Sequence, residues 1–129
     1  MPLRAVIAVI HYNGKVLIGK KRSDSPKFLA GLWHMPGETV RPRESDKEAL
    51  IRGMGEETGL EITVGRYLAS HVIPMNKEVR WYECFSNSGN AVAGSDLAEV
   101  KWIDKRQVST YCDPKVRDHW PEEIKNYFR

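Results

Sequence analysis

The sequence lacks the features that mark several large classes of protein. It has only two cysteines, Cys84 and Cys112, and their spacing matches no metal-binding or redox pair. We therefore expect both to be reduced thiols, as in a cytosolic protein, and we expect no disulfide framework. No apolar run approaches the length of a membrane-spanning helix, and the chain has no internal repeat or low-complexity tract.

An excess of charge of one sign is also missing. The net charge is +3 and the basic residues are spread along the chain, which gives little reason to expect stable binding to nucleic acid. The start, MPLRAVIAVI, has neither the long apolar region nor the cleavage site of a signal peptide and reads as a first strand. We therefore expect a cytoplasmic protein with no membrane partner. A length of 129 residues suits a single domain, residues 1–129.

Strand and helix signals are present along most of the chain. Two β-prone runs, Arg4–Tyr12 and Lys15–Gly19, are joined by Asn13-Gly14, which predicts a hairpin. Asp113-Pro114 and Pro121 predict the starts of two short helices near the end of the chain.

The stretch from Gly37 to Leu60 predicts a longer helix with a marked beginning and end. Ser45 and Glu48 have the spacing of a capping box, and Gly59 is placed to end the helix in a left-handed conformation. At about 100° per residue, the helix should divide into two sides. We expect the core-facing side to carry Leu50, Ile51 and Met54, and the other side to carry Ala49, Gly53, Glu56 and Glu57.

Two carboxylates, Glu56 and Glu57, fall at the C-terminal end of this helix, where the helix dipole is already negative. Arg52, four residues before Glu56, offsets only part of this charge. A divalent cation such as Mg²⁺ or Mn²⁺ could offset the remainder, because closely spaced carboxylates with a loop carbonyl suit hard, oxygen-binding ions. The alternative is a solvated, glutamate-rich helix face.

The same stretch resembles the Nudix box of MutT-like hydrolases. That pattern is Gly, five residues, Glu, seven residues, then Arg-Glu-U-x-Glu-Glu-x-Gly-U, where U is a bulky aliphatic residue. The matching residues are Glu44, Arg52, Met54, Glu56, Glu57, Gly59 and Leu60, preceded by the common Pro36-Gly37 pair. The resemblance covers nearly the whole chain and implies an α/β fold, the Nudix α/β/α sandwich with a mixed, curved β-sheet.

Three positions depart from the pattern. The first Gly of the box is Glu38, a loop position that is commonly Gly is Arg43, and the glutamate expected after Arg52 is Gly53. In the family that glutamate helps to bind metal or acts as the base on the attacking water. Its absence indicates that the base was lost or moved, and the candidate substitutes are Glu38, Glu44 and Glu99.

The resemblance also implies roles for individual residues. The main-chain carbonyl of Gly37 would bind the metal together with Glu56 and Glu57. Glu44 would bind metal or orient the ligands, and Arg52 would hold the glutamates in place, so the implied catalytic set is Glu44, Arg52, Glu56 and Glu57. Glu99 is the candidate for a further ligand that reaches the metal across the sheet. The alternative for Glu99 is a solvated glutamate at a strand edge.

Three residues are candidates for binding the substrate. Lys21 and Arg22 follow the second strand and would face the substrate phosphates, and the alternative is an exposed basic strand end. Trp81 and Tyr82 are neighbours on a later strand, so their side chains should point to opposite faces. Tyr82 is the candidate to stack on a nucleobase, and the alternative for either ring is the core.

The implied activity is metal-dependent hydrolysis of a nucleoside diphosphate linked to another group, with Mg²⁺ or Mn²⁺ as the cofactor. The leading hypothesis is a pyrophosphohydrolase that converts a nucleoside triphosphate, standard or oxidised, to the monophosphate and pyrophosphate. The alternatives are an ADP-ribose or nucleotide-sugar pyrophosphatase, and a nucleotide-binding domain with weak or no catalysis, which Gly53 supports. The partner is a small-molecule nucleotide, and a homodimer is one alternative for the oligomeric state because many relatives dimerise.

Overall fold

One mixed sheet forms the centre of the molecule. The computed structural model of the chain describes residues 3–26 and 29–129. In these residues, seven strands pair in the order β3-β2-β1-β6-β5, with β4 added to β1 and β7 added to β2. The β1 and β6 strands run parallel, whereas the other pairs are antiparallel. The strands are β1 (Arg4–Tyr12), β2 (Lys15–Lys21), β3 (Trp33–His34), β4 (Gly37–Thr39), β5 (Ile62–Ile73), β6 (Lys77–Ser86) and β7 (Leu97–Asp104).

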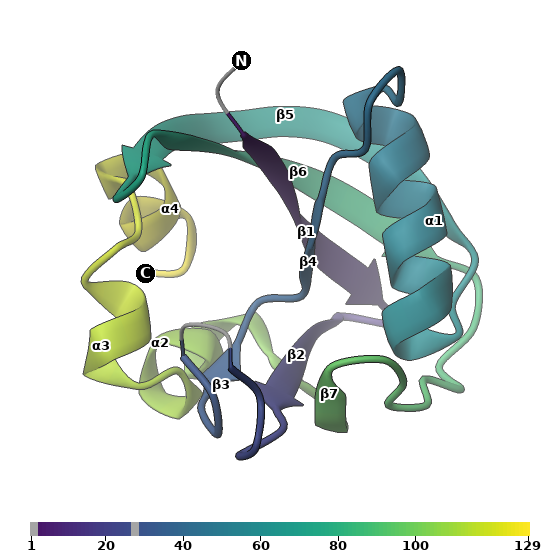
Figure 1. Cartoon of the computed structure of the whole chain (residues 1–129). Coiled ribbons are helices and arrows are strands. Elements are labelled where there is room, and N and C mark those ends of the chain that lie inside the picture. Colours follow the sequence, from purple (N-terminus) through teal and green to yellow (C-terminus); the bar gives the residue numbers. More distant parts are fainter. Residues whose placement is uncertain (1–2, 27–28) are drawn as a thin grey trace.

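Helices lie on both faces of this sheet. The longest helix, α1 (Asp46–Thr58), covers one face, and a group of short helices near the end of the chain covers the other (Figure 1). That group comprises η1 (Lys105–Gln107), α2 (Val108–Tyr111), α3 (Pro114–Arg117) and α4 (Glu122–Tyr127). A mixed sheet between two helical layers confirms the predicted α/β sandwich.

Alternation along the central strands divides the core into two clusters. Val16 and Ile18 of β2 pack toward the C-terminal helices, whereas Leu17 between them packs toward α1. The two thiols follow the same division, with Cys84 in the α1 cluster and Cys112 in the other. Because the sheet separates them they form no disulfide, and burial raises the pKa of each thiol to about 12.

The predicted hairpin and the predicted late helix starts are confirmed. Asn13 (φ 50°) and Gly14 (φ 79°) join β1 to β2 in the left-handed region that these two residue types adopt most readily. Asp113 caps α3 through a hydrogen bond from the main-chain N–H of Lys115. Within the described residues, no helix is both long and apolar enough to cross a bilayer.

Both ends of α1 are those that the sequence indicates. The Ser45 hydroxyl accepts a hydrogen bond from the Glu48 N–H at 3.1 Å, and the Glu48 carboxylate accepts one from the Ser45 N–H at 2.9 Å. Gly59 ends the helix with φ 70° and donates its N–H to the carbonyl of Gly55. The predicted capping box and glycine cap are therefore confirmed.

The predicted orientation of α1 was wrong for part of the helix. Ile51 is 43% exposed, whereas Ala49, Gly53 and Glu57, expected on the outer side, are buried. The reason is β4, which packs against the side of α1 that carries Gly53. The buried stripe is therefore wider than a single core-facing row and leaves Ile51 outside it. It runs through Ala49, Leu50, Gly53, Met54, Glu57 and Thr58.

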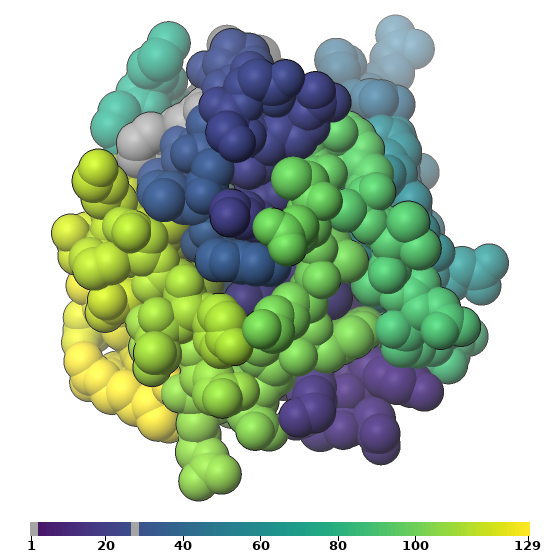
Figure 2. All heavy atoms as spheres, turned by 90° about the horizontal axis from the view of Figure 1, so that it is seen from below, coloured from purple at the N-terminus to yellow at the C-terminus, as the bar shows by residue number. Residues whose placement is uncertain are grey.

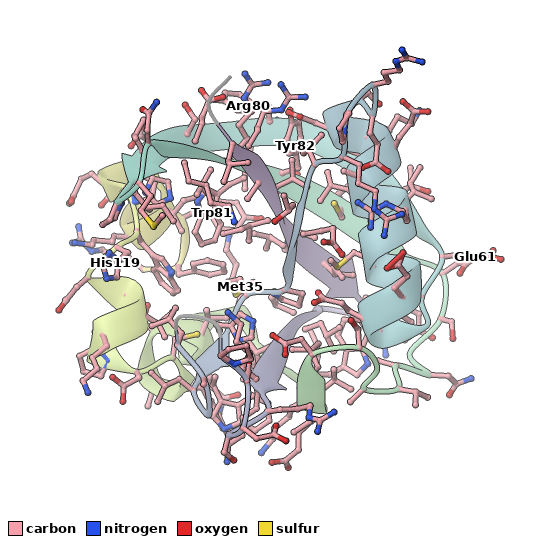
Figure 3. The ribbon with its side chains drawn as sticks, viewed as in Figure 1. Met35, Glu61, Arg80, Trp81, Tyr82 and His119 are labelled. Atoms are coloured by element: carbon pink, nitrogen blue, oxygen red, sulfur yellow. The ribbon has the colours of Figure 1, made fainter. Side chains whose placement is uncertain are left out.

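The N-terminal end of α1 is fastened to the sheet by one carboxylate. Asp46 pairs with Arg4 of β1 at 2.8 Å and with Arg80 of β6 at 3.1 Å, and it accepts a hydrogen bond from the Tyr82 hydroxyl at 2.5 Å. Figure 3 shows Arg80 and Tyr82 at this end of the molecule. Burial and the bond to Asp46 raise the pKa of Tyr82 to about 12, so this hydroxyl stays protonated and keeps donating.

Candidate active site

One guanidinium organises the acidic residues around α1. Arg52 binds both oxygens of Glu44, with Nε to Oε2 at 2.7 Å and Nη2 to Oε1 at 2.9 Å. Its third nitrogen, Nη1, lies 3.4 Å from Oε2 of Glu38 and 3.4 Å from Oε1 of Glu56. Nη2 also donates to the main-chain carbonyl of Thr39 on β4. A single positive charge therefore gathers three carboxylates from a strand, a loop and the helix itself.

Glu44 is the most firmly held of these carboxylates. Besides Arg52, the main-chain N–H of Arg41 donates to it at 3.0 Å, and its side chain is 14% exposed. The hydrogen bonds from Arg52 and from the Arg41 main chain lower the pKa of Glu44 to about 2. The same pairing raises the pKa of Arg52. Glu44 and Arg52 therefore stay charged at any physiological pH and fix the loop between β4 and α1.

The space next to Gly53 is filled by Glu38. A Cβ atom at position 53 would lie 2.6 Å from both Cβ and Cγ of Glu38, which is closer than real carbon atoms approach. Gly55, on the same helix, has nothing within 4 Å of the corresponding point. Glycine at 53 is therefore needed for the Glu38 side chain to cross the helix there, whereas the packing gives no reason for glycine at 55.

The carboxylates Glu56 and Glu57 differ in their surroundings. The Glu56 side chain is 44% exposed and also lies 3.7 Å from Arg41, whereas Glu57 is only 8% exposed. The loop before β7 covers this helix end, with Gly94 donating its N–H to the carbonyl of Glu57. A side chain at position 94 would collide with the Glu56 carbonyl, at 2.6 Å. The last turn of α1 contains no basic residue.

These oxygens suit a hard divalent cation in type and charge. Negative charge is concentrated here, because Arg52 is shared among Glu38, Glu44 and Glu56, and Glu57 adds a further buried carboxylate at the same helix end. Over residues 3–26 and 29–129, however, no three His, Cys, Asp or Glu side chains are already arranged around one point. Holding a cation would therefore require side chains such as Glu56 to turn away from Arg52.

Gly37 lies where the expected carbonyl ligand belongs in the chain, immediately before Glu38 on β4. It pairs with Ile7 of β1, and a Cβ atom at position 37 would come within 2.8 Å of the carbonyl oxygen of Val6. Glycine thus lets the box loop lie directly against β1.

Glu99 is placed differently from the box carboxylates. It pairs with Lys20 of β2 at 3.7 Å, and its side chain is 59% exposed. Its neighbours Val100 and Trp102 pack on the α1 side of the sheet, so alternation turns Glu99 to the other side. Figure 2 shows the green segment through β7 lying between the C-terminal helices and α1. A role for Glu99 as a metal ligand remains a prediction from sequence, and the structure does not bring it together with Glu56 or Glu57.

The residues expected to contact the substrate make other contacts in this structure. Arg22 makes two hydrogen bonds to Asp24, at 2.9 and 3.0 Å, and both side chains are largely exposed. Lys21, at the end of β2, lies close enough to His34 to help lower the pKa of that imidazole to about 4, although burial is the larger cause. Tyr82 points toward α1 and Trp81 toward the C-terminal helices, as expected of neighbours on a strand (Figure 3). The Tyr82 hydroxyl is engaged by Asp46, so its present contacts are structural.

The sequence predicts Glu38 only as one of three candidate substitutes for the missing base, and does not predict its contact with Gly53. The available signal was a pair of departures, because the box pattern has Gly at 38 and Glu at 53, and this chain has Glu at 38 and Gly at 53. At Arg43 the residue type departs from the pattern but the backbone does not. Arg43 replaces a common Gly, yet its φ of 67° lies in the left-handed region that favours glycine.

Comparison with known proteins agrees with this architecture. The family model for the NUDIX domain matches residues 1–126. A CTP pyrophosphohydrolase of Escherichia coli is 44% identical over 69 residues, which cover 54% of this chain and 50% of that protein. An ADP-ribose pyrophosphatase of Methanocaldococcus jannaschii is 28% identical over an alignment covering 99% of this chain and 74% of that protein.

Solved structures show the same fold. The solution structure of the E. coli ORF135 protein superimposes with a TM-score of 0.73 at 28% identity, covering 96% of this chain and 89% of that one. The chain spans only half the length of the CTP pyrophosphohydrolase that it matches. The box spacing, the mixed sheet between helices and the family match over residues 1–126 together show that this chain belongs to the MutT-like Nudix hydrolase family.

Proposed function

We propose that this domain is a Mg²⁺- or Mn²⁺-dependent pyrophosphohydrolase that converts a nucleoside triphosphate to the monophosphate and pyrophosphate. The observation that carries the proposal is the charge balance around α1. Four glutamates, Glu38, Glu44, Glu56 and Glu57, surround a helix whose Arg52 is already shared by three of them. A substrate rich in phosphate could approach such a surface only with a cation between the two.

The ligand set that we propose is Glu56, Glu57 and the main-chain carbonyl of Gly37. When bound, the cation neutralises phosphate oxygens and lowers the pKa of the attacking water. Glu44 and Arg52 act as positioning residues, because their paired hydrogen bonds tie the box loop to the helix. Glu99 is not needed in this set.

The reaction forms one bond and breaks one. The water oxygen bonds to one of the two phosphorus atoms that flank the α–β bridging oxygen, and the bond between that phosphorus and the bridging oxygen breaks. The bridging oxygen keeps the electron pair and leaves with its phosphoryl group, and a nearby carboxylate accepts the water proton. The products are the nucleoside monophosphate and pyrophosphate.

Phosphate contacts in this proposal come from the end of β2. Arg22 is exposed and pairs with a neighbouring surface carboxylate, Asp24, so exchanging that partner for a phosphate costs little. Lys21 adds a second positive charge beside it.

A second candidate is hydrolysis of ADP-ribose or a nucleotide sugar. The relative named ADP-ribose pyrophosphatase aligns over 99% of the chain, whereas the relative named CTP pyrophosphohydrolase, although more similar, aligns over 54%. The chemistry at the acidic helix would be the same, because both substrates contain a diphosphate. The third candidate, nucleotide binding with little turnover, follows from the missing carboxylate at Gly53.

A substrate panel separates these candidates. Nucleoside triphosphates including CTP and oxidised dGTP, together with ADP-ribose and nucleotide sugars, are incubated with Mg²⁺ or Mn²⁺ while pyrophosphate and phosphate are followed separately. We expect release of pyrophosphate from a triphosphate, and loss of most of that activity in Glu57→Gln. Faster cleavage of ADP-ribose would favour the second candidate. No cleavage, with metal-dependent nucleotide binding retained, would favour the third.

A further inference from the structure

We propose that Glu38 supplies the carboxylate that position 53 lacks, and that it acts as a ligand for the divalent cation. The inference rests on the proposed metal-dependent function and adds a residue from outside α1 to the ligand set. In this chain the Gly and Glu of two box positions are exchanged, so that the carboxylate comes from β4 and the space for it comes from the helix.

The steric evidence ties the two positions together. A Cβ atom built at position 53 would lie 2.6 Å from both Cβ and Cγ of Glu38. These two atoms therefore fill the space in which any side chain of residue 53 would begin. A third Glu38 atom, Oε2, would lie 3.1 Å from the same point. The carboxylate of Glu38 therefore lies over the helix surface where a longer side chain at position 53 would start. Only glycine at 53 allows this, which explains a residue that weakens the helix.

The ion pairs of Arg52 show that Glu38 belongs to the same acidic cluster as Glu56. Its Oε2 atom and the Oε1 atom of Glu56 both lie 3.4 Å from one nitrogen of Arg52, so the two carboxylates already converge on the same positive charge. The Glu38 side chain is 22% exposed, which leaves it reachable by a small cation. Gly53 precedes Glu57 by about one helical turn, so Glu38, which contacts position 53, reaches the helix one turn before Glu57.

The backbone holds Glu38 in this position. Its strand, β4, pairs with β1 in a register that sets Glu38 opposite Val6, and Arg52 binds the carbonyl of the next residue, Thr39. The other carboxylate oxygen, Oε1, accepts a hydrogen bond from the Thr39 N–H at 2.9 Å. One oxygen is thus anchored to the main chain and the other faces Arg52 and Glu56. This arrangement differs from a glutamate that is free in solvent.

A purely structural role would make Glu38 a counter-charge for Arg52 and nothing more. The two roles differ in what they require of the cation. A counter-charge affects folding stability with or without metal, whereas a ligand affects metal affinity in a folded protein. The test therefore measures Mn²⁺ binding to the protein alone, without nucleotide and without turnover.

The experiment compares wild type with Glu38→Gln, Gly53→Glu, the exchanged double variant Glu38→Gly with Gly53→Glu, and Glu61→Gln as a matched control. Glu61 lies just beyond α1, and its side chain points away from the molecule in Figure 3. Free Mn²⁺ is measured by electron paramagnetic resonance, and urea unfolding is recorded for each variant. Glu38→Gln keeps the shape of the side chain and removes only its charge.

We expect Glu38→Gln to weaken Mn²⁺ binding by at least about tenfold, because even loss of a partner outside the coordination shell costs roughly 10–100-fold. Gly53→Glu should be destabilised by the clash with Glu38, and the exchanged double variant should recover both stability and Mn²⁺ binding. Wild-type affinity in a folded Glu38→Gln variant would overturn the role of Glu38. Wild-type affinity in Glu57→Gln as well would instead overturn the proposed metal site and function.

Discussion

Glycines on the two sides of α1 have opposite surroundings. On the side that faces β4, Gly53 is in contact with Glu38, and a Cβ atom there has no room. On the open side, Gly55 has nothing within 4 Å. Both glycines weaken an isolated helix by about 1 kcal/mol relative to alanine, so helix propensity does not distinguish them. Packing distinguishes them. Contact with Glu38 explains the glycine at 53, whereas no contact explains the glycine at 55.

A carboxylate that is missing at one position of a motif can be replaced by one on a neighbouring element. Compared with the box pattern, the helix lacks a side chain at 53, and the strand next to it carries one at 38. The net charge near Arg52 is unchanged by such an exchange. What changes is the backbone that carries the carboxylate, which is now a strand hydrogen-bonded to β1 and not a helix.

The largest change in stability is expected from filling the β4 side. Gly53→Ala introduces a Cβ into occupied space, and overpacking of this kind costs about 1–3 kcal/mol in the free energy of unfolding. Urea unfolding monitored by tryptophan fluorescence measures this. In a Glu38→Gly background the same substitution should stabilise the protein. Destabilisation in both backgrounds would mean that Glu38 is not the residue that requires Gly53.

A substitution on the open side of α1 should raise the free energy of unfolding instead of lowering it. Gly55→Ala places a methyl group where it meets no other atom, so we expect a gain of about 0.5–1 kcal/mol from helix propensity. The same unfolding assay applies, and Mn²⁺ binding should be unaffected. A loss of stability would contradict the openness of this side.

A smaller gain is expected in the loop that links the two regions. Arg43 has φ 67°, which costs a residue with a side chain about 1–2 kcal/mol. Arg43→Gly relieves this cost, but glycine adds about 0.4–1 kcal/mol of conformational entropy to the unfolded chain. A net gain of roughly 0.5 kcal/mol should remain, measured against Lys47→Gly as a control that has no such strain.

A separate prediction concerns the pH dependence of stability on the β4 side. Because the hydrogen bonds from Arg52 lower the pKa of Glu44 to about 2, this carboxylate stabilises the folded protein above its unfolded pKa near 4.3. That contribution is lost as pH falls from about 4.3 to 2. In Glu44→Gln, stability should depend less on pH in this window. Parallel pH profiles for the two proteins would contradict the pairing.

Local sequence signals were enough for the frame of the site. The Asn13-Gly14 hairpin, the capping box at Ser45 and the stop at Gly59 are each set by a few neighbouring residues, and all three are confirmed. The fold followed from the box spacing and the order of strands around it. These features depend on short-range geometry, which a single sequence records directly.

The features that were missed depend on contacts between distant segments. Helical periodicity alone predicts Ile51 on the core side, whereas β4 covers a different side of α1 and leaves Ile51 exposed. The pairing of Glu38 with Gly53 joins residues from a strand and a helix, and no local pattern specifies such a contact. Glu99 shows the same limit, since its direction depends on how β7 pairs with β2.

Binding of Mn²⁺ to wild type and to Glu57→Gln, with Glu61→Gln as the control, tests the central claim most directly. Glu57 is the buried carboxylate of the group, and Glu61 carries the same charge just beyond the helix. We expect wild type and Glu61→Gln to bind the ion with equal affinity and Glu57→Gln to bind it at least about tenfold more weakly. Equal affinity in all three proteins would contradict a metal site at the end of α1.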